Sequence, residues 1–232
     1  MNDDKFLKSV SDELVDIFNG KWNSIVEIIK TNPCSTEQAY ELLWEKIFIK
    51  HFDYDIFCEI DRQRQVRIGS TSKTVDMILK RDDTDLVAIE FKQSNASFHQ
   101  DYLNQLISYI ASALRHINIG IVLCNQIYIF DYDDSKPNDE QDIVVIPFEK
   151  DNQLGASFVH LFSRKAFNLS TIKDWIKEHT KQQRNIEKIK SELSSHLLLE
   201  LLQQYFLAKY TQSEYEEAIK GWNIHISPSP SK

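Results

Sequence analysis

The sequence predicts an α/β protein in which a mixed sheet is flanked by helices and followed by a helical C-terminal appendage. Two observations carry this prediction. The spacing of apolar residues changes from a helical period to a period of two after His51, and from about residue 158 it is helical almost to the end. A chain of 232 residues with 42% hydrophobic and 27% charged residues is within the globular range. We therefore expect N-terminal helices over 1–31, a core over 32–150 and an appendage over 151–232.

Two helices are predicted before the sheet. Residues 4–30 carry apolar side chains at three- and four-residue spacing, and Asn19-Gly20 is expected to break this helix in two. A second helix is expected to begin after Ser35, since Ser35 as N-cap with Gln38 three residues later has the form of a capping box. Tyr40, Leu43, Trp44, Ile47 and Phe48 continue its apolar face.

The middle of the chain is rich in β-branched and aromatic residues, which favour strands. The predicted strands cover 55–60, 65–69, 74–80, 85–91, 119–124, 126–131 and 142–147, with a helix over 99–116. The run IGIVLC at 119–124 is apolar on both faces, as is typical of a central strand covered by helices. Further helices are predicted over 169–193, 195–209 and 212–221, followed by a frayed tail.

Several classes of protein are excluded by what the sequence lacks. Neither GxGxxG nor GxxxxGK[ST] occurs, so we expect no nucleotide binding by those motifs and no nucleotide-driven motor in this chain. No apolar run approaches the roughly 18 residues of a membrane span, and the acidic N-terminus does not resemble a secretory signal. Cys34, Cys58 and Cys124 form no CxxC pair, which favours reduced thiols in a cytoplasmic protein over a zinc site.

The net charge of −8 excludes a protein that is basic throughout, but one segment is locally basic. Between residues 62 and 81 there are six basic side chains and a single acid. Those in the first part of the segment are Arg62, Arg64, Arg67 and Lys73. Two interpretations stay open: a hairpin edge protected by charge, or a surface that binds a nucleic-acid backbone.

Two neighbouring predicted strands place acids on one face. Alternation with apolar residues puts Asp76 on the polar face of its strand, and it puts Glu90 and Lys92 together on the polar face of the next. A three-residue turn centred on Asp83 would bring Asp76 directly opposite Glu90, with Cβ atoms about 5 Å apart. A slip of one residue would separate them onto different faces.

Facing carboxylates repel, so a cation is expected between them. Lys92 is one candidate, which would make the group a structural ion pair. Mg²⁺ is the other, because this hard cation takes one or two carboxylates and keeps several waters. Two carboxylates with an ammonium group beside them are suited to metal-assisted hydrolysis of a phosphodiester.

This pattern resembles the PD-(D/E)xK nuclease superfamily, with Asp76 and Glu90-Phe91-Lys92 as its motif. More narrowly, about residues 35–132 resemble the nuclease domain at the N-terminus of type I restriction-enzyme R subunits. The segments that carry this resemblance are STEQAYELLWEKIF, FCEIDRQRQVRI, KTVDMIL, LVAIEFKQ, YLNQLISYIASA and IGIVLCNQIYIFDY. The resemblance implies a restriction-endonuclease-like core and a Mg²⁺ cofactor for which Mn²⁺ can substitute.

The resemblance also implies roles for individual residues. Asp76 and Glu90 would be the metal ligands and Lys92 the catalytic lysine. Gln105 and Tyr109 match the QxxxY element of RecB-like members, and as i and i+4 on a helix they share a face. From that face they would reach a phosphate of the nucleic acid or orient the lysine. Val75 replaces the proline of the superfamily name.

The acidic residue that the family contributes from the preceding helix is less determined. Glu37, Glu41 and Glu45 share the predicted helix, and Glu37 is preferred because it lies nearest the apolar face. Alternatively, Glu37 would only stabilise the helix, because a negative charge in the first turn interacts favourably with the helix dipole.

The implied function is Mg²⁺-dependent cleavage of DNA in restriction or phage defence. Two alternatives stay open: a non-catalytic module that binds nucleic acid or protein, and an endonuclease that processes RNA. The apolar positions of the C-terminal helices, such as Ile172, Trp175, Ile186 and Ile189, are expected to pack on the core. Alternatively, these apolar positions would form a contact in a homodimer or in a larger defence assembly.

Overall fold

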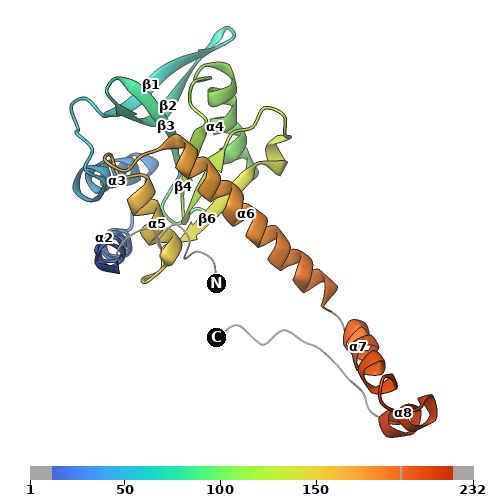
Figure 1. The fold of residues 1–232 in the computed structure, drawn as a ribbon. Helices are drawn as coiled ribbons and strands as arrows, with labels where there is room; N and C mark the ends of the chain where they lie inside the picture. Colours follow the sequence, from blue (N-terminus) through green and yellow to red (C-terminus); the bar gives the residue numbers. More distant parts are fainter. Residues whose placement is uncertain (1–11, 194, 222–232) are drawn as a thin grey trace. The chain divides into compact units, whose positions relative to one another are not determined.

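The computed structural model describes residues 12–193 and 195–221 and has an α/β fold (Figure 1). Its sheet has six strands in the order β1-β2-β3-β4-β5-β6. The strands are β1 (Ile60–Ile68), β2 (Thr71–Arg81), β3 (Thr84–Phe91), β4 (Ile119–Leu123), β5 (Gln126–Asp131) and β6 (Asp142–Pro147). Only the β3–β4 pair among them is parallel, and helix α4 (Gln100–Ser112) makes the crossover that a parallel pair requires.

Helices cover both faces of this sheet. Helices α2 (Asp12–Thr31), α3 (Glu37–Phe52) and α5 (Gln153–Leu161) share one apolar core with alternate side chains of the strands. The largest side chains of that core include Trp22, Trp44, Phe48, Phe52 and Phe158, all fully buried. Helix α4 covers the other face through Leu103, Leu106 and Ile110. Strand β4 lies between β3 and β5 with every residue buried, which confirms the prediction of a central strand.

The predictions for the first two helices need correction. Helix α2 runs without a break through Asn19-Gly20, because burial of Trp22, Ile25 and Val26 on the turns that follow outweighs the roughly 1 kcal/mol that a glycine costs a helix. The part of this predicted helix before residue 12 lies outside the described residues. Thr36 rather than Ser35 is the N-cap of α3, and its hydroxyl oxygen accepts a hydrogen bond from the Ala39 N–H at 3.2 Å.

The first predicted strand is also wrong. Residues 55–59 form a turn, whereas β1 begins at Ile60 and continues through the interval that the sequence suggested was a loop. Asp55 explains the turn, since its carboxylate accepts a hydrogen bond from the Phe57 N–H at 2.7 Å. Helix α5 begins at Gln153, before the point where the helical pattern is recognisable, with Asn152 as its N-cap.

The C-terminal helices follow the prediction closely. They are α6 (Leu169–Glu192), α7 (Ser195–Leu207) and α8 (Gln212–Ile219). The contacts divide the chain into two compact units, residues 1–180 and 181–232, so the predicted boundary near residue 150 falls inside the first unit. In α6, Ile172, Trp175 and Ile176 are buried in the core of the first unit, whereas Ile186 and Ile189 are 43% and 58% exposed. None of the helices described is long and apolar enough to cross a membrane.

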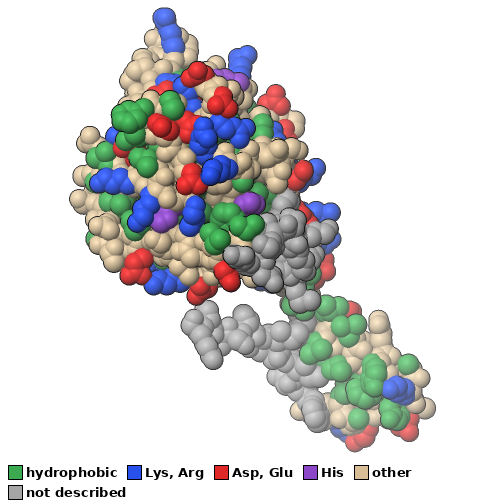
Figure 2. Space-filling model, turned by 60° about the vertical axis from the view of Figure 1, so that its left-hand side comes forward, with side chains coloured by type: hydrophobic (Ala, Val, Ile, Leu, Met, Phe, Trp, Pro, Cys, Tyr) green, Lys and Arg blue, Asp and Glu red, His purple; other side chains and the backbone are tan. Residues whose placement is uncertain are grey.

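The surface of the first unit mixes charges of both signs. On the face drawn in Figure 2, basic and acidic side chains are interspersed.

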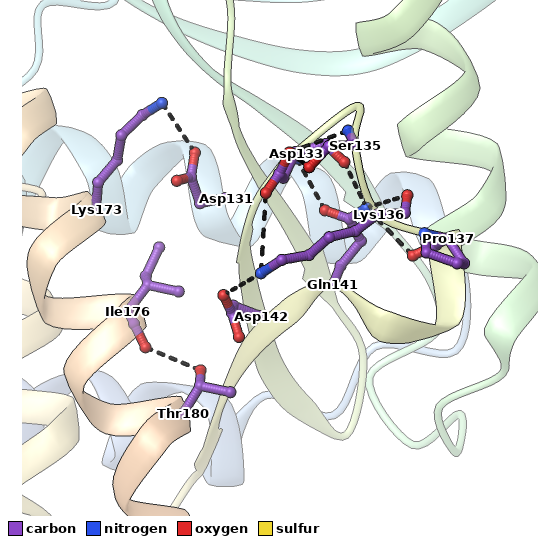
Figure 3. Close-up of polar contacts among 10 residues, drawn as sticks. All are labelled: Asp131, Asp133, Ser135, Lys136, Pro137, Gln141, Asp142, Lys173, Ile176 and Thr180. Carbon is purple, nitrogen blue, oxygen red and sulfur yellow. Dashed lines mark hydrogen bonds and ion pairs between the residues drawn. The ribbon is translucent and has the colours of Figure 1, made fainter. Parts of the chain in front are cut away.

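One ordered charge cluster joins the start of α6 to the strands β5 and β6 (Figure 3). There Lys173 Nζ lies 3.1 Å from the Asp131 carboxylate, and Lys136 Nζ lies 2.7 Å from that of Asp142. The Gln141 amide donates to the carbonyls of the intervening loop. We interpret this cluster as a structural anchor for α6.

Candidate active site

The site lies where β2 and β3 separate. Their paired residues include Leu79 with Val87, Ile78 with Ala88 and, at this end, Met77 with Ile89. Beyond that pair the two strands are no longer paired, and a side chain contacts the backbone instead. The Asp76 Oδ2 accepts a hydrogen bond from the Phe91 N–H at 2.8 Å. The separation of the strands therefore holds the Asp76 carboxylate next to the backbone of the Glu90–Lys92 segment.

The pairing of β2 with β3 next to the site has the predicted register. The turn between these strands, however, differs from the three-residue turn that was predicted. Arg81 pairs with Thr84, so only Asp82 and Asp83 form the turn, with φ of 50° and 62°. Two central residues with positive φ are the mark of a type I′ hairpin. A bulge at Leu79–Lys80 then shifts the pairing by one residue. The shorter turn and the bulge compensate, and Asp76 stays beside Glu90.

Glu90 is the most enclosed polar group of the site, with an exposure of 1%. Its Oε1 accepts hydrogen bonds from Lys92 Nζ at 2.8 Å and from Gln105 Nε2 at 2.6 Å. Its Oε2 is buried and has no hydrogen-bond partner in the described structure. A buried carboxylate oxygen without a donor is costly, and a proton or a cation at this oxygen would relieve that cost.

Helix α4 supplies the second layer of the site. Gln105 donates to the Tyr109 hydroxyl at 2.8 Å as well as to Glu90. Both side chains therefore lie on the face of α4 that covers the sheet, and Tyr109 is 4% exposed. Tyr102, three residues before Gln105 on the same helix, places its ring 5.2 Å from Lys92 Nζ, within the range of a cation–π contact. Tyr102 was not among the predicted site residues, although its helical spacing from Gln105 is a usable signal.

The electrostatics of the site follow from burial. Burial, together with the charge of Asp76, raises the pKa of Glu90 to about 7. Burial also raises the pKa of Asp76, against the opposing effects of the Phe91 N–H and the Lys92 charge. Burial alone would lower the pKa of Lys92, but the surrounding carboxylates, led by Glu90, raise it overall. The lysine is therefore a stable ammonium group at neutral pH.

Two of the three candidate glutamates of α3 reach the site. A cavity of about 320 Å³ is lined by Glu37, Gln38, Glu41, Arg62, Gln63, Asp76 and Phe91. Glu37 is half-exposed, and its Oε1 lies 3.9 Å from Lys92 Nζ. Glu41 is buried and accepts from Arg62 Nε at 2.7 Å and from Gln63 Nε2 at 2.8 Å. Glu45 pairs with Arg62 at 2.8 Å and is not among the residues that line the cavity.

The four basic residues predicted to bind nucleic acid fall into two groups. Arg62 is held by Glu41 and Glu45, and Arg64 is held by Asp61 and Asp85. Arg67 and Lys73 are exposed near the tip of the β1–β2 hairpin. Sequence reasoning did not identify the acidic partners of Arg62 and Arg64, because three of the four lie about 20 residues away along the chain.

The residues present fit a hard divalent cation. Within residues 12–193 and 195–221, no three His, Cys, Asp or Glu side chains gather closely enough to form a metal site by themselves. Asp76 and Glu90 nevertheless offer two carboxylates, and one of their oxygens has no donor in the described structure. Mg²⁺ is commonly held by one or two carboxylates, with water and substrate phosphate as its other ligands. The donor set suits that cation better than Zn²⁺, which prefers nitrogen and sulfur.

Comparison with known families agrees with the resemblance drawn from the motifs. No curated protein matches this chain. A family model described as the N terminus of the type I restriction enzyme R protein matches residues 36–147. That range extends from the N-cap of α3 to the end of β6 and contains every residue of the site described above. Residues 36–147 are therefore similar to the N-terminal domain of type I restriction enzyme R proteins, on a restriction-endonuclease-like α/β core.

Proposed function

We propose that this protein is a Mg²⁺-dependent nuclease that hydrolyses phosphodiester bonds of DNA, in restriction or in defence against phage. The family match supports a nuclease-like domain. The observation that carries the finer proposal is the state of Glu90. Its carboxylate is buried, its pKa is raised to about 7, and one of its oxygens has no hydrogen-bond partner in the described structure. A purely structural ion pair with Lys92 would not require that arrangement.

Asp76 and Glu90 are the residues that would hold the cation. When bound, Mg²⁺ polarises the phosphate and lowers the pKa of a coordinated water. Gln105 holds Glu90 by a hydrogen bond at 2.6 Å, so the carboxylate is oriented before any ligand arrives. The Asp76 carboxylate is oriented in the same way by the Phe91 N–H.

Lys92 supplies positive charge where the phosphate would gain negative charge. Its ammonium group is 2.8 Å from Glu90 and 3.9 Å from Glu37, and its side chain is largely enclosed. Because its raised pKa keeps it protonated, we assign it charge stabilisation and orientation of the nucleophile. The half-exposed Glu37 faces the same ammonium group and remains our preferred acid from α3, with Glu41 next.

Cleavage assays test the proposal directly. Plasmid, linear duplex, single-stranded DNA and RNA are incubated with Mg²⁺ or Mn²⁺, using the wild type, Asp76→Ala and Lys92→Ala. Lys150→Ala is the matched control, because that lysine forms an exposed ion pair with Glu27, away from the site. We expect the two site variants to lose at least a hundredfold in rate and the control to keep its rate. Equal rates in all variants would rule out this active site.

A non-catalytic binding module is the rival, and calorimetry separates it from the enzyme. The nuclease should take up Mn²⁺ with an affinity that Asp76→Asn abolishes. A module that only kept the fold should bind DNA or protein without metal uptake. Preference for RNA over DNA in the cleavage assay would favour the RNA-processing alternative.

A further inference from the structure

The β1–β2 hairpin extends past the rest of the sheet (Figure 1). Strand β2 pairs with β3 only as far as Met77, whereas it pairs with β1 from Leu79 to Thr71. Residues 62–75 are therefore a two-stranded ribbon with no third strand in the described structure. At about 3.3 Å per residue, the six residues from Gln63 to Ile68 span about 20 Å. Asp76 directly follows the last residue of the ribbon, so the ribbon adjoins the candidate active site.

The composition of the ribbon differs from that of the whole chain. Residues 62–75 contain four basic residues and no acidic one, although the chain carries a net charge of −8. They also contain no Phe, Tyr or Trp. At the upper end of the molecule, where Figure 1 shows this hairpin, Lys and Arg side chains project from the surface in Figure 2.

The two faces of the ribbon are not equivalent. Residues that pair directly across an antiparallel ribbon share a face. Val66 pairs with Lys73, and Val66 is buried in the apolar cluster beneath α4. Lys73 therefore belongs to the face that turns toward α4.

The opposite face carries only polar side chains, and we call it the polar face. Its members are Gln65, Arg67, Ser72 and Thr74, of which all but the half-buried Thr74 are exposed. Gln65 Nε2 donates to Thr74 Oγ1, and Ser72 Oγ donates to Gln65 Oε1, both at 2.8 Å. Among the described residues the Arg67 side chain has no hydrogen-bond or ion-pair partner, in contrast to the ion-paired Arg62 and Arg64.

The polar face continues into the cavity of the site. Gln63, two residues before Gln65 on β1, lines this cavity, and its Nε2 donates a hydrogen bond to Glu41 at 2.8 Å. Asp76 and Gln63, which follow on the two strands of the ribbon, both line the cavity with Glu37. A molecule lying along the polar face would thus reach the carboxylates of Asp76 and Glu37.

The geometry points to duplex DNA as the occupant of this surface, with the ribbon in the major groove and Arg67 on a backbone phosphate. This inference rests on the proposed function and adds the form of the substrate. The major groove is about 12 Å wide and admits a two-stranded ribbon, whereas the minor groove of about 6 Å does not. Arg, Gln, Ser and Thr are side chains that contact phosphates and base edges. A single strand is disfavoured because the ribbon offers no aromatic ring for base stacking.

A pair of matched variants tests the assignment of faces. Arg67→Ala removes one charge from the polar face, and Lys73→Ala removes one charge from the face toward α4. Fluorescence anisotropy is measured with a 20-base-pair duplex and with its single strand, in EDTA and over a range of NaCl concentrations. Unchanged melting temperatures verify folding.

We expect Arg67→Ala to weaken duplex binding about fivefold and to reduce the slope of log K against log salt by about 0.9, as for one lost phosphate contact. Lys73→Ala should weaken it less than twofold. Equal losses in the two variants, no loss in Arg67→Ala, or tighter binding of the single strand by the wild type would each overturn the inference.

Cleavage of the same duplex in Mg²⁺ separates this inference from the proposed function. A wild type that binds through Arg67 but does not cut contradicts only the nuclease. A wild type that cuts while Arg67→Ala binds and cuts equally well contradicts only the role of the ribbon.

Discussion

Replacing Glu90 by glutamine should stabilise the metal-free protein while removing a metal ligand. Glutamine keeps the shape of the side chain, and its amide oxygen can still accept from Lys92 and Gln105, which hold Oε1 now. The change removes a negative charge that is 1% exposed and has one oxygen without a donor in the described structure. Glu90→Gln therefore removes the free-energy cost of burying that charge.

The magnitude follows from the pKa. In the folded protein the pKa of Glu90 rises from 4.5 to about 7. At about 1.4 kcal/mol for each pH unit, this corresponds to about 3 kcal/mol. Because the folded carboxyl group binds its proton more tightly than the unfolded one, its contribution to stability is complete below pH 4.5 and is lost as the pH rises to about 7. Glutamine does not titrate, so the stability gap between variant and wild type should grow from near zero at pH 4.5 to about 3 kcal/mol above pH 7.

Urea unfolding in EDTA at several pH values between 5 and 9 measures this gap. Glu27→Gln is the matched control, since Glu27 is exposed and pairs only with Lys150 in the described structure. Its free energy of unfolding should differ little from that of the wild type. A variant that is no more stable than the wild type at pH 8, or a gap that does not change with pH, would refute the reasoning. Adding Mg²⁺ should stabilise the wild type and leave Glu90→Gln unchanged.

Three further predictions concern the surroundings of the site. Arg62→Ala should destabilise the protein by about 2–4 kcal/mol in urea unfolding, because it leaves the buried Glu41 without its cation, and the added substitution Glu41→Gln should restore much of the loss. Tyr109→Phe should lower the cleavage rate several-fold and change the melting temperature by only a few degrees, since it removes one hydrogen bond to the glutamine that orients the site; an unchanged rate would remove that hydroxyl from the mechanism. Gly120→Ala should cost about 1–3 kcal/mol in unfolding experiments, because the new Cβ would lie 2.2 Å from Phe130 Cζ, and a stability equal to the wild type would contradict the packing described for β4.

The position of the acids shows where sequence reasoning succeeds. Alternation of apolar residues in β2 and β3 predicted that Asp76 and Glu90 lie on the polar faces of their strands, and the observed pairing of Met77 with Ile89 keeps the expected register beside them. The turn of the same hairpin was wrong by one residue. Its two-residue form depends on the bulge at Leu79–Lys80, and the local sequence contains no pattern that predicts this bulge.

The basic segment shows where sequence reasoning stops. Composition identified the excess of positive charge over residues 62–81, but it did not separate the side chains that hold the fold from those that are exposed. Arg62 is paired with acids of α3, and Arg64 is paired partly with an acid of β3. These contacts join elements about 20 residues apart, so only the packed structure reveals which charges are neutralised.

The amino-acid sequence alone determined the alternation of helix and strand, the central position of β4 and the common face of the two acids, because these depend on periodicity over a few residues. The tertiary structure decided the burial of Glu90, its raised pKa, the choice of ion-pair partners and the two faces of the hairpin ribbon. Those properties depend on desolvation and on distances between distant segments, and both arise only when the sheet and its helices pack together.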